Sequence, residues 1–138
     1  MTQFVLDTNI VLDVWVFADA AAVPLREQLL SGQITWLATT AMRSELERVL
    51  AYPKIVPRLN FYKTTLQDVL AQFDQHAHIV EAAPKAPVTC SDADDQIFID
   101  LAVAHHAVLL SKDQAVLSMQ KRLSDLGVTA KSAIDLGV

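Results

Sequence analysis

Apolar runs that end abruptly in polar or turn-forming residues alternate along the chain with stretches of helical periodicity. The short apolar runs predict five strands, at residues 3–6, 34–38, 78–84, 107–111 and 128–131. Helical spacing of apolar residues predicts five helices, at residues 20–30, 41–52, 61–76, 94–105 and 114–126. Residues 53–57 begin and end with proline and predict a break, and Asp7 to Asn9 predict a turn or a helix start.

Strands that alternate with helices through short loops predict an α/β fold. We expect a three-layer α/β/α sandwich with a central, mainly parallel sheet of four to five strands. The length of 138 residues predicts a single domain over residues 1–138. In such sheets the chemistry lies at the carboxyl ends of the strands, near the switch in strand order. Asp7 and Asp113 both follow predicted strands and are expected at that edge.

Composition narrows the class of protein. Hydrophobic residues make up 52% of the chain and charged residues 20%, which argues against disorder. No apolar run approaches the roughly 18 residues that a membrane span needs, so we expect a soluble protein that does not enter a membrane. The N-terminus lacks the features of a signal peptide, and the lone Cys90 cannot form an internal disulfide. Together these observations predict a cytoplasmic protein.

The net charge of −5 bears on possible partners. An acidic chain binds a polyanion only through local basic groups or bridging cations, so the charge is a mild argument against nucleic acid. The same charge is expected of a protein that gathers carboxylates around a divalent cation. Mg²⁺ and Mn²⁺ take oxygen ligands, and the candidate acids are Asp7, Glu45, Asp95 and Asp113. Two carboxylates about 4 Å apart repel by roughly 4 kcal/mol at an effective dielectric constant of about 20, so their convergence would require a cation.

Each of these acids could instead have a purely structural role. Asp7 can cap a helix, and Asp113 can belong to a turn. Asp92 or Asp94 can cap the helix that follows them, and we expect Asp94 to be the solvated cap. Glu45 and Glu47 lie near opposite edges of one apolar helix face, and each has an arginine neighbour to pair with. Periodicity does not choose between these two glutamates, and spacing alone leaves the metal site undecided.

Three longer stretches resemble the motifs of a known family, the PIN domain nucleases. "FVLDTNIVLD" is similar to the opening motif, "SELERVLAYPKI" to the second, and "DADDQIFIDLAVAHHAVLLSKD" to the third and fourth together. Within the family, the chain resembles the small prokaryotic toxins of toxin–antitoxin pairs (VapC-like proteins). The likeness covers nearly the whole chain and loosens from Thr129 onward.

The resemblance implies a metal-dependent ribonuclease, a hydrolase of RNA phosphodiester bonds that leaves a 5′-phosphate and a 3′-hydroxyl. The acids that it carries over as catalytic are Asp7, Glu45, Asp95 and Asp113. These four, with Asp92 as an additional acid, would hold one or two Mg²⁺ or Mn²⁺ ions, directly or through water. A cognate antitoxin protein and a homodimer are the further partners that it implies.

Residues beside these acids are candidates for supporting roles. Thr8 and Asn9 are expected to orient Asp7, and Ser111 is expected to do the same for Asp113. Lys112 stands where relatives more commonly have glycine, and it is a candidate contact for a substrate phosphate.

One departure from the family pattern keeps an alternative open. Many relatives carry an acid where this chain has Ala115, and its loss could weaken a second metal site. The alternative is a catalytically silent PIN-like protein that acts through protein–protein interaction. A phosphohydrolase with a nucleophilic aspartate is disfavoured, because position 9 is Asn and the usual Asp-x-Asp is absent.

Overall fold

The computed structural model describes residues 2–133 and contains a five-stranded parallel sheet. The strands are β1 (Thr2–Leu6), β2 (Ile34–Ala38), β3 (Ala77–Ile79), β4 (Val108–Leu110) and β5 (Ala130–Lys131), in the order β3-β2-β1-β4-β5. All four pairings are parallel, which confirms the predicted α/β fold. The third strand is shorter than expected and ends at Ile79, before the proline-containing loop.

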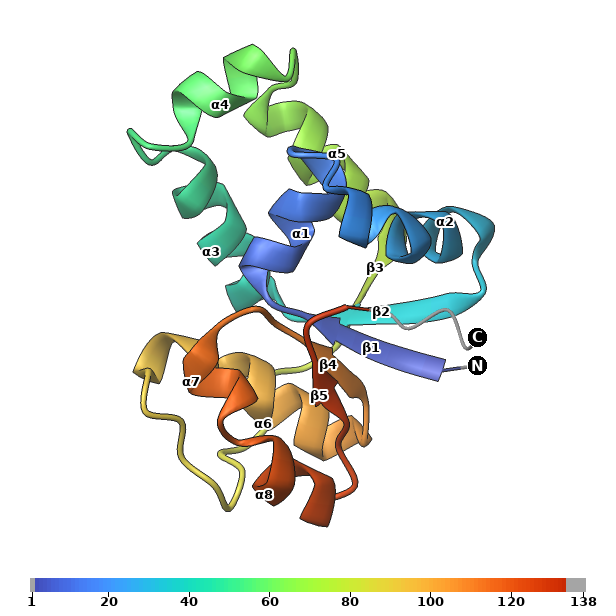
Figure 1. The fold of residues 1–138 in the computed structure, drawn as a ribbon, viewed down its shortest axis with the longest axis vertical. Helices are drawn as coiled ribbons and strands as arrows, with labels where there is room; N and C mark the ends of the chain where they lie inside the picture. Colours follow the sequence, from blue (N-terminus) through green and yellow to red (C-terminus); the bar gives the residue numbers. More distant parts are fainter. Residues whose placement is uncertain (1, 134–138) are drawn as a thin grey trace.

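Helices cover both faces of this sheet (Figure 1). They are α1 (Thr8–Trp15), α2 (Val23–Ser31), α3 (Thr40–Leu50), α4 (Val56–Phe61), α5 (Leu66–His76), α6 (Gln96–His105), α7 (Gln114–Leu117) and α8 (Gln120–Asp125), with 3-10 turns η1 (Ala20–Ala22) and η2 (Ala93–Asp95). In Figure 1, α1 to α5 lie above the sheet and α6 to α8 below it. Successive residues of β1 are therefore all buried from Phe4 to Leu6, as expected of a strand covered on both faces.

The strand order reverses direction between β1 and β4. The chain first adds β2 and β3 on one side of β1, and then returns to place β4 on the other side. Right-handed crossovers in opposite directions put their helices on opposite faces, which leaves a crevice at the carboxyl ends of these two strands. The backbone N–H of Asp7 donates to the carbonyl oxygen of Leu110 at 3.0 Å, so the residues after β1 and β4 are neighbours.

The prediction for residues 53–76 was wrong in two respects. Helix α4 begins at Val56, within the predicted break, because Pro57 lies in its first turn, where the absent N–H costs no helical hydrogen bond. Helix α5 begins only at Leu66, after Thr65, whose hydroxyl accepts a hydrogen bond from the Asp68 N–H at 3.1 Å. Phe61 was assigned to the apolar face of one long helix, but it ends α4 and is 78% exposed.

Smaller differences concern helix ends. The predicted helix at 114–126 is two short helices, and the hydroxyl of Ser118, at the break, donates to the Ala115 carbonyl at 3.1 Å. The turn or helix start expected after the first strand is the two-turn helix α1.

Within residues 2–133, no single helix is long and apolar enough to cross a membrane. The bent pair formed by residues 8–15 and 20–31 passes by length and composition alone, with an angle of 99° between its parts.

Candidate metal centre

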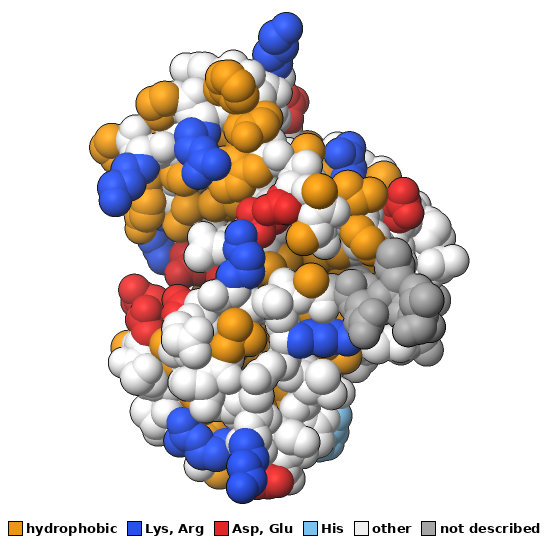
Figure 2. All heavy atoms as spheres, viewed as in Figure 1, with side chains coloured by type: hydrophobic (Ala, Val, Ile, Leu, Met, Phe, Trp, Pro, Cys, Tyr) orange, Lys and Arg blue, Asp and Glu red, His pale blue; other side chains and the backbone are white. Residues whose placement is uncertain are grey.

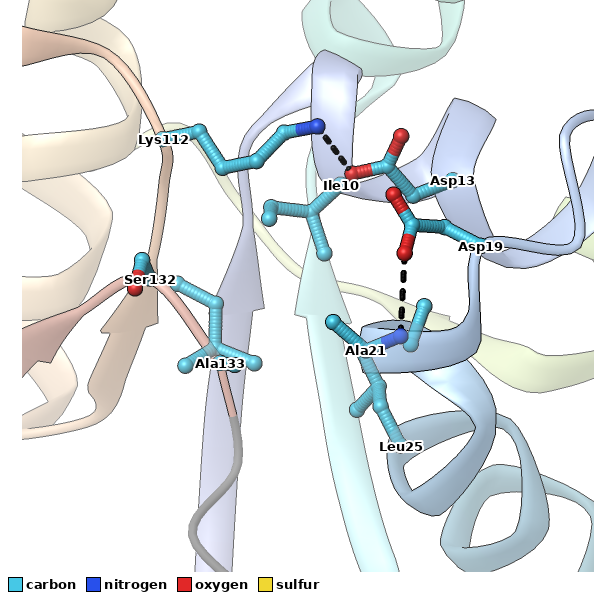
Figure 3. Close-up of a pocket in the computed structure, with 10 residues that line it drawn as sticks. Ile10, Asp13, Asp19, Ala21, Leu25, Lys112, Ser132 and Ala133 are labelled. Atoms are coloured by element: carbon cyan, nitrogen blue, oxygen red, sulfur yellow. Dashed lines mark hydrogen bonds and ion pairs between the residues drawn. The ribbon is translucent and has the colours of Figure 1, made fainter.

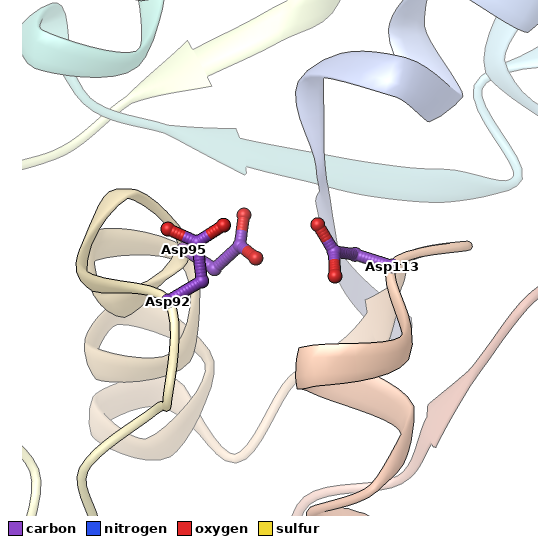
Figure 4. Close-up of side chains that lie close together, drawn as sticks. All are labelled: Asp92, Asp95 and Asp113. Atoms are coloured by element: carbon purple, nitrogen blue, oxygen red, sulfur yellow. The ribbon is translucent and has the colours of Figure 1, made fainter.

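Three carboxylates meet in the crevice between the start of α6 and the start of α7. One oxygen from each of Asp92, Asp95 and Asp113 lies within 4.8 Å of the others. Figure 4 shows Asp92 and Asp95 on one side of the site and Asp113 facing them from the other. We call these three residues the acidic cluster. Asp92 is exposed, Asp113 is half-buried and Asp95 is buried.

The turn before α6 determines which acids enter the cluster. The carboxylate of Asp92 accepts a hydrogen bond from the Asp94 N–H at 3.0 Å and so caps η2. Asp94 itself is exposed in the first turn, so the expectation that Asp94 would be the cap is corrected to Asp92. Asp95 makes no capping hydrogen bond with its side chain. Its carboxylate is therefore available to a ligand.

Asp95 is the acid that most clearly requires a cation or a proton to compensate its charge. It is 7% exposed, and its Oδ2 is buried with no hydrogen-bond partner in the described part of the chain. Burial, followed by the charges of Asp7 and Asp113, raises the pKa of Asp95 to about 8. A buried, unpartnered carboxylate oxygen is costly unless a cation or a proton compensates it. A divalent cation that prefers oxygen ligands fits this donor set.

Asp7 lies beside the acidic cluster and is held by two hydrogen bonds. Its Oδ1 accepts from the Asn9 N–H at 3.2 Å, and its Oδ2 accepts from the Ser111 hydroxyl at 2.6 Å. The residue is 4% exposed, and burial raises its pKa although both hydrogen bonds oppose the shift. Asp7 thus caps α1, as one reading of the sequence proposed, and also contributes negative charge next to Asp95 and Asp113.

The structure distinguishes the two glutamates of α3 that periodicity could not. Glu45 is half-buried and accepts a hydrogen bond from the Thr8 hydroxyl at 2.6 Å. Burial raises the pKa of Glu45, and the charge of Asp7 adds to the shift. Glu47 is exposed and pairs with Arg43 at 3.8 Å. Glu45 is therefore the glutamate that faces the acids.

The supporting residues have partners that differ from those expected. The Thr8 hydroxyl orients Glu45 and not Asp7, and Asn9 contacts Asp7 through its backbone only. The Ser111 hydroxyl donates to Asp7 and accepts from the Asp113 N–H at 3.0 Å. Ser111 therefore joins the acid after β1 to the acid after β4. The sequence held a signal for this link, because Asp7 and Ser111 both lie at the ends of predicted strands, and the carboxyl ends of parallel strands meet at one edge of a sheet.

A buried acid that sequence reasoning did not select lies near the cluster. Asp13 on α1 is 5% exposed, and its Oδ2 is 2.5 Å from the Nζ of Lys112 (Figure 3). The pair borders a small cavity together with Ile10, Asp19, Leu25 and Ser132. Lys112, the candidate phosphate contact, thus has its amino group held by Asp13 at the edge of the crevice. The sequence pattern that could have identified Asp13 is a single acid within an otherwise apolar stretch. A buried acid of this kind needs a cation to compensate its charge.

The family model described as "PIN domain" matches residues 3–115, which include every acid discussed above. The chain belongs to the PIN domain family. PIN domains are typically metal-dependent nucleases, and the acidic cluster of this PIN domain is its candidate metal centre. A search of curated proteins found no match.

Proposed function

We propose that this PIN domain is an Mg²⁺- or Mn²⁺-dependent ribonuclease. The observation that carries the proposal is the buried, unpartnered Oδ2 of Asp95, placed among the oxygens of Asp92 and Asp113 at the switch in strand order. An acid in this environment is expected to hold a proton or a metal rather than to stabilise the fold. The membership in a family of nucleases makes a metal the better supported choice.

In the proposed reaction, a divalent cation held by the acidic cluster would acidify a water molecule and offset the charge that develops on the phosphodiester. The water oxygen bonds to phosphorus, the bond from phosphorus to O3′ breaks, and the leaving oxygen takes a proton. The products are a 5′-phosphate and a 3′-hydroxyl. Asp7 and Glu45 add negative charge around the site, and the hydroxyls of Ser111 and Thr8 fix their orientation. Lys112 is a proposed contact for a substrate phosphate, since it directly precedes Asp113 and its side chain is 46% exposed.

Digestion of pooled cellular RNA tests this proposal. Wild type and Asp95→Asn are incubated with RNA and Mn²⁺ or Mg²⁺, and new ends that carry a 5′-phosphate are mapped. Asp94→Asn is the matched control, because Asp94 is an exposed acid in the same turn and lies outside the acidic cluster. We expect discrete ends from wild type and Asp94→Asn and none from Asp95→Asn. Equal cleavage by all three proteins would refute the assignment, and intact RNA throughout would favour the silent PIN-like protein.

The biological role that we propose is that of a toxin in a toxin–antitoxin pair, acting in the cytoplasm. Its support is the resemblance to the toxin subgroup, together with exposed apolar side chains that a protein partner could cover. The proposed partners are a cognate antitoxin and a second copy of the chain. Growth arrest on expression of wild type but not of Asp95→Asn would support the toxin role. Sedimentation of the purified protein as a dimer would support self-association, and a monomer at all concentrations would refute it.

A further inference from the structure

The distribution of charge around α4 differs from that of the rest of this acidic chain. Residues 48–67 contain no Asp or Glu, although the whole chain has 16 acids and a net charge of −5. We define the α3–α4 segment as residues 48–63. Its cations are Arg48, Lys54, Arg58 and Lys63, and its aromatic residues are Tyr52, Phe61 and Tyr62.

Two aromatic side chains of this segment, Phe61 and Tyr62, are exposed and in contact with each other. Phe61 is 78% exposed, and Tyr62 is 40% exposed. Their rings meet edge to face with centroids 5.0 Å apart, and Tyr62 also contacts Phe17, 5.8 Å away. The guanidinium of Arg58 lies 3.7 Å above the ring of Phe17. These contacts pre-order an aromatic surface that carries a cation at its centre.

Three of the four cations, Lys54, Arg58 and Lys63, have no acidic partner in the described part of the chain. Arg48, Lys54, Arg58 and Lys63 are all exposed, and none forms a salt bridge there. Arg43, which precedes this segment on α3, does have acidic partners: it pairs with Asp74 at 2.7 Å and with Glu47. The charge of Arg48 acts on Glu45 and opposes the rise in its pKa. The positive charge of Lys54, Arg58 and Lys63 is uncompensated in the described part of the chain, which suits a polyanion.

The segment is continuous with the crevice that holds the acids. Arg48 lies three residues after Glu45 on α3, and both line an open groove between α3 and the start of α6. From Glu45, α3 leads away from the sheet toward α4 and ends at Leu50, roughly 8 Å further along its axis at 1.5 Å per residue. Figure 2 shows acidic side chains in the hollow at the middle of the molecule, with apolar and basic side chains mixed over α3 and α4 above it.

We propose that the α3–α4 segment binds single-stranded RNA next to the bond that is cleaved. The cations contact phosphates, and Phe61 and Tyr62 stack against bases, which is how proteins bind single strands without reading their sequence. Bases in a duplex are unavailable for such stacking, so the site selects single-stranded regions. This inference rests on the proposed ribonuclease function and specifies where its substrate lies.

Binding of a fluorescent 12-nucleotide RNA, measured by anisotropy, tests the proposal. Asp95→Asn serves as the parent protein so that the RNA stays intact, and Phe61→Ala, or Lys54→Gln with Arg58→Gln, is added to it. We expect Phe61→Ala to weaken binding about tenfold, in line with the loss of one stacked base. The double substitution should lower the slope of log affinity against log salt by about 1.4, since each phosphate contact contributes about 0.7 for a single strand.

A charge-matched variant and a duplex serve as controls. Lys121→Gln with Arg122→Gln removes two exposed cations from α8, on the other side of the sheet, and should leave RNA affinity unchanged. A hairpin RNA of the same length should bind more weakly than the single strand. Equal affinity of Phe61→Ala and its parent, or an equal loss in the α8 variant, would overturn the proposal.

Two further measurements separate this inference from the proposed function. Hydrolysis of bis(4-nitrophenyl) phosphate by wild type with Mn²⁺ reports the catalytic centre without any RNA-binding surface. Turnover of this small diester together with unchanged RNA binding in Phe61→Ala overturns the inference and leaves the ribonuclease standing. No turnover together with weakened RNA binding rejects the catalytic proposal and supports the surface. If Phe61→Ala alters sedimentation but not RNA affinity, the segment is an interface with a second copy, and the proposal is overturned.

Discussion

The acidic cluster and the α3–α4 segment place opposite charges in opposite environments within one chain. The cluster brings together like charges that include a buried aspartate, Asp95. Burial, followed by the charges of Asp7 and Asp113, raises the pKa of Asp95 to about 8. The segment gathers cations and aromatic rings on the surface, with no acid between Glu47 and Asp68. Neither arrangement is what stability alone favours, because one buries repelling charges and the other exposes large apolar side chains.

The difference between the two regions is the basis for proposing different partners for them. A small cation would compensate the buried carboxylates, and a flexible polyanion would fit the exposed cations and rings. An RNA strand engaged by both regions would meet positive charge along its backbone and negative charge only at the bond to be cleaved. A bridging metal ion at that bond would explain how an acidic protein accepts an RNA substrate.

The largest effect is expected when the cluster loses its buried acid. Asp95→Asn should reduce RNA cleavage at least about 100-fold, since even residues that only orient metal ligands cost 10- to 100-fold when changed. Above pH 8, where Asp95 is ionised, the metal-free variant should also be more stable than wild type by about 0.5–2 kcal/mol, because a repelling buried charge is gone. Activity assays and thermal melts in EDTA measure the two changes. An Asp95→Asn protein that is both active and less stable would show that the carboxylate is structural.

A smaller loss is expected from the residue that joins the two strand ends. Ser111→Ala removes the hydroxyl that donates to Asp7 and accepts from the Asp113 N–H, and should lower Mn²⁺ affinity or activity about 10- to 100-fold. Titration with Mn²⁺ measures the change. Ser124→Ala, in an exposed part of α8, is the control and should behave as wild type. Equal affinities in the two variants would exclude an orienting role for Ser111.

The ion pair next to the cluster should contribute to stability. Lys112→Ala leaves the buried Asp13 carboxylate without its cation, and should lower the free energy of unfolding by about 1–3 kcal/mol. Denaturation in urea measures this loss. Lys121→Ala removes an exposed lysine and should change stability by no more than about 0.5 kcal/mol. Adding Asp13→Asn to Lys112→Ala should recover part of the loss, and a further loss would show that Asp13 is stabilised by other groups.

The stability of the metal-free protein should fall as pH rises. The pKa values of Asp7, Glu45 and Asp95 are all raised by burial, so the folded protein binds protons more tightly than the unfolded chain does. This contribution is complete below about pH 4, near the ordinary value of 3.8, and is lost as pH rises through the pKa of about 8 of Asp95. Melting temperatures in EDTA from pH 5 to pH 8.5 measure the trend. Asp95→Asn should flatten it, and Mn²⁺ at pH 8 should reverse it.

The smallest effect is expected at the exposed ring of the α3–α4 segment. Phe61→Ala should change the free energy of unfolding by no more than about 0.5 kcal/mol, because the side chain is 78% exposed. A buried phenylalanine would cost about 3–5 kcal/mol on the same change. A loss in that range, measured by urea denaturation, would show that Phe61 packs in the fold and is not displayed for a ligand.

Much of the sheet could be predicted because β1, β2 and β4 are apolar runs that end sharply at polar residues. Asp7 and Asp113 could be placed at one edge for the same reason, since the carboxyl ends of parallel strands lie together. The choice of Glu45 over Glu47 could not be made from the sequence. It depends on a hydrogen bond to Thr8, 37 residues away, and helical periodicity says nothing about such a partner.

The exposure of Phe61 could not be predicted either. Apolar spacing assigned it to a buried helix face, but spacing cannot tell which of two short helices a residue joins, or whether anything covers it. Pro57 was read as a break, whereas its place in the first turn of α4 makes it compatible with a helix. The absence of acids from residues 48–67 was visible in the sequence. It indicated a binding surface only after the structure showed that the aromatic side chains of the same segment are exposed.

Titration of the metal-free protein with Mn²⁺ by calorimetry, at pH 7 in buffers of different ionisation enthalpy, tests the central claim most directly. At this pH Asp95 is largely protonated, because its pKa is about 8. We expect saturable binding that releases close to one proton per ion, with both binding and release lost in Asp95→Asn and kept in Asp94→Asn. Absence of saturable binding at millimolar Mn²⁺, or binding that Asp95→Asn leaves unchanged, would contradict the account.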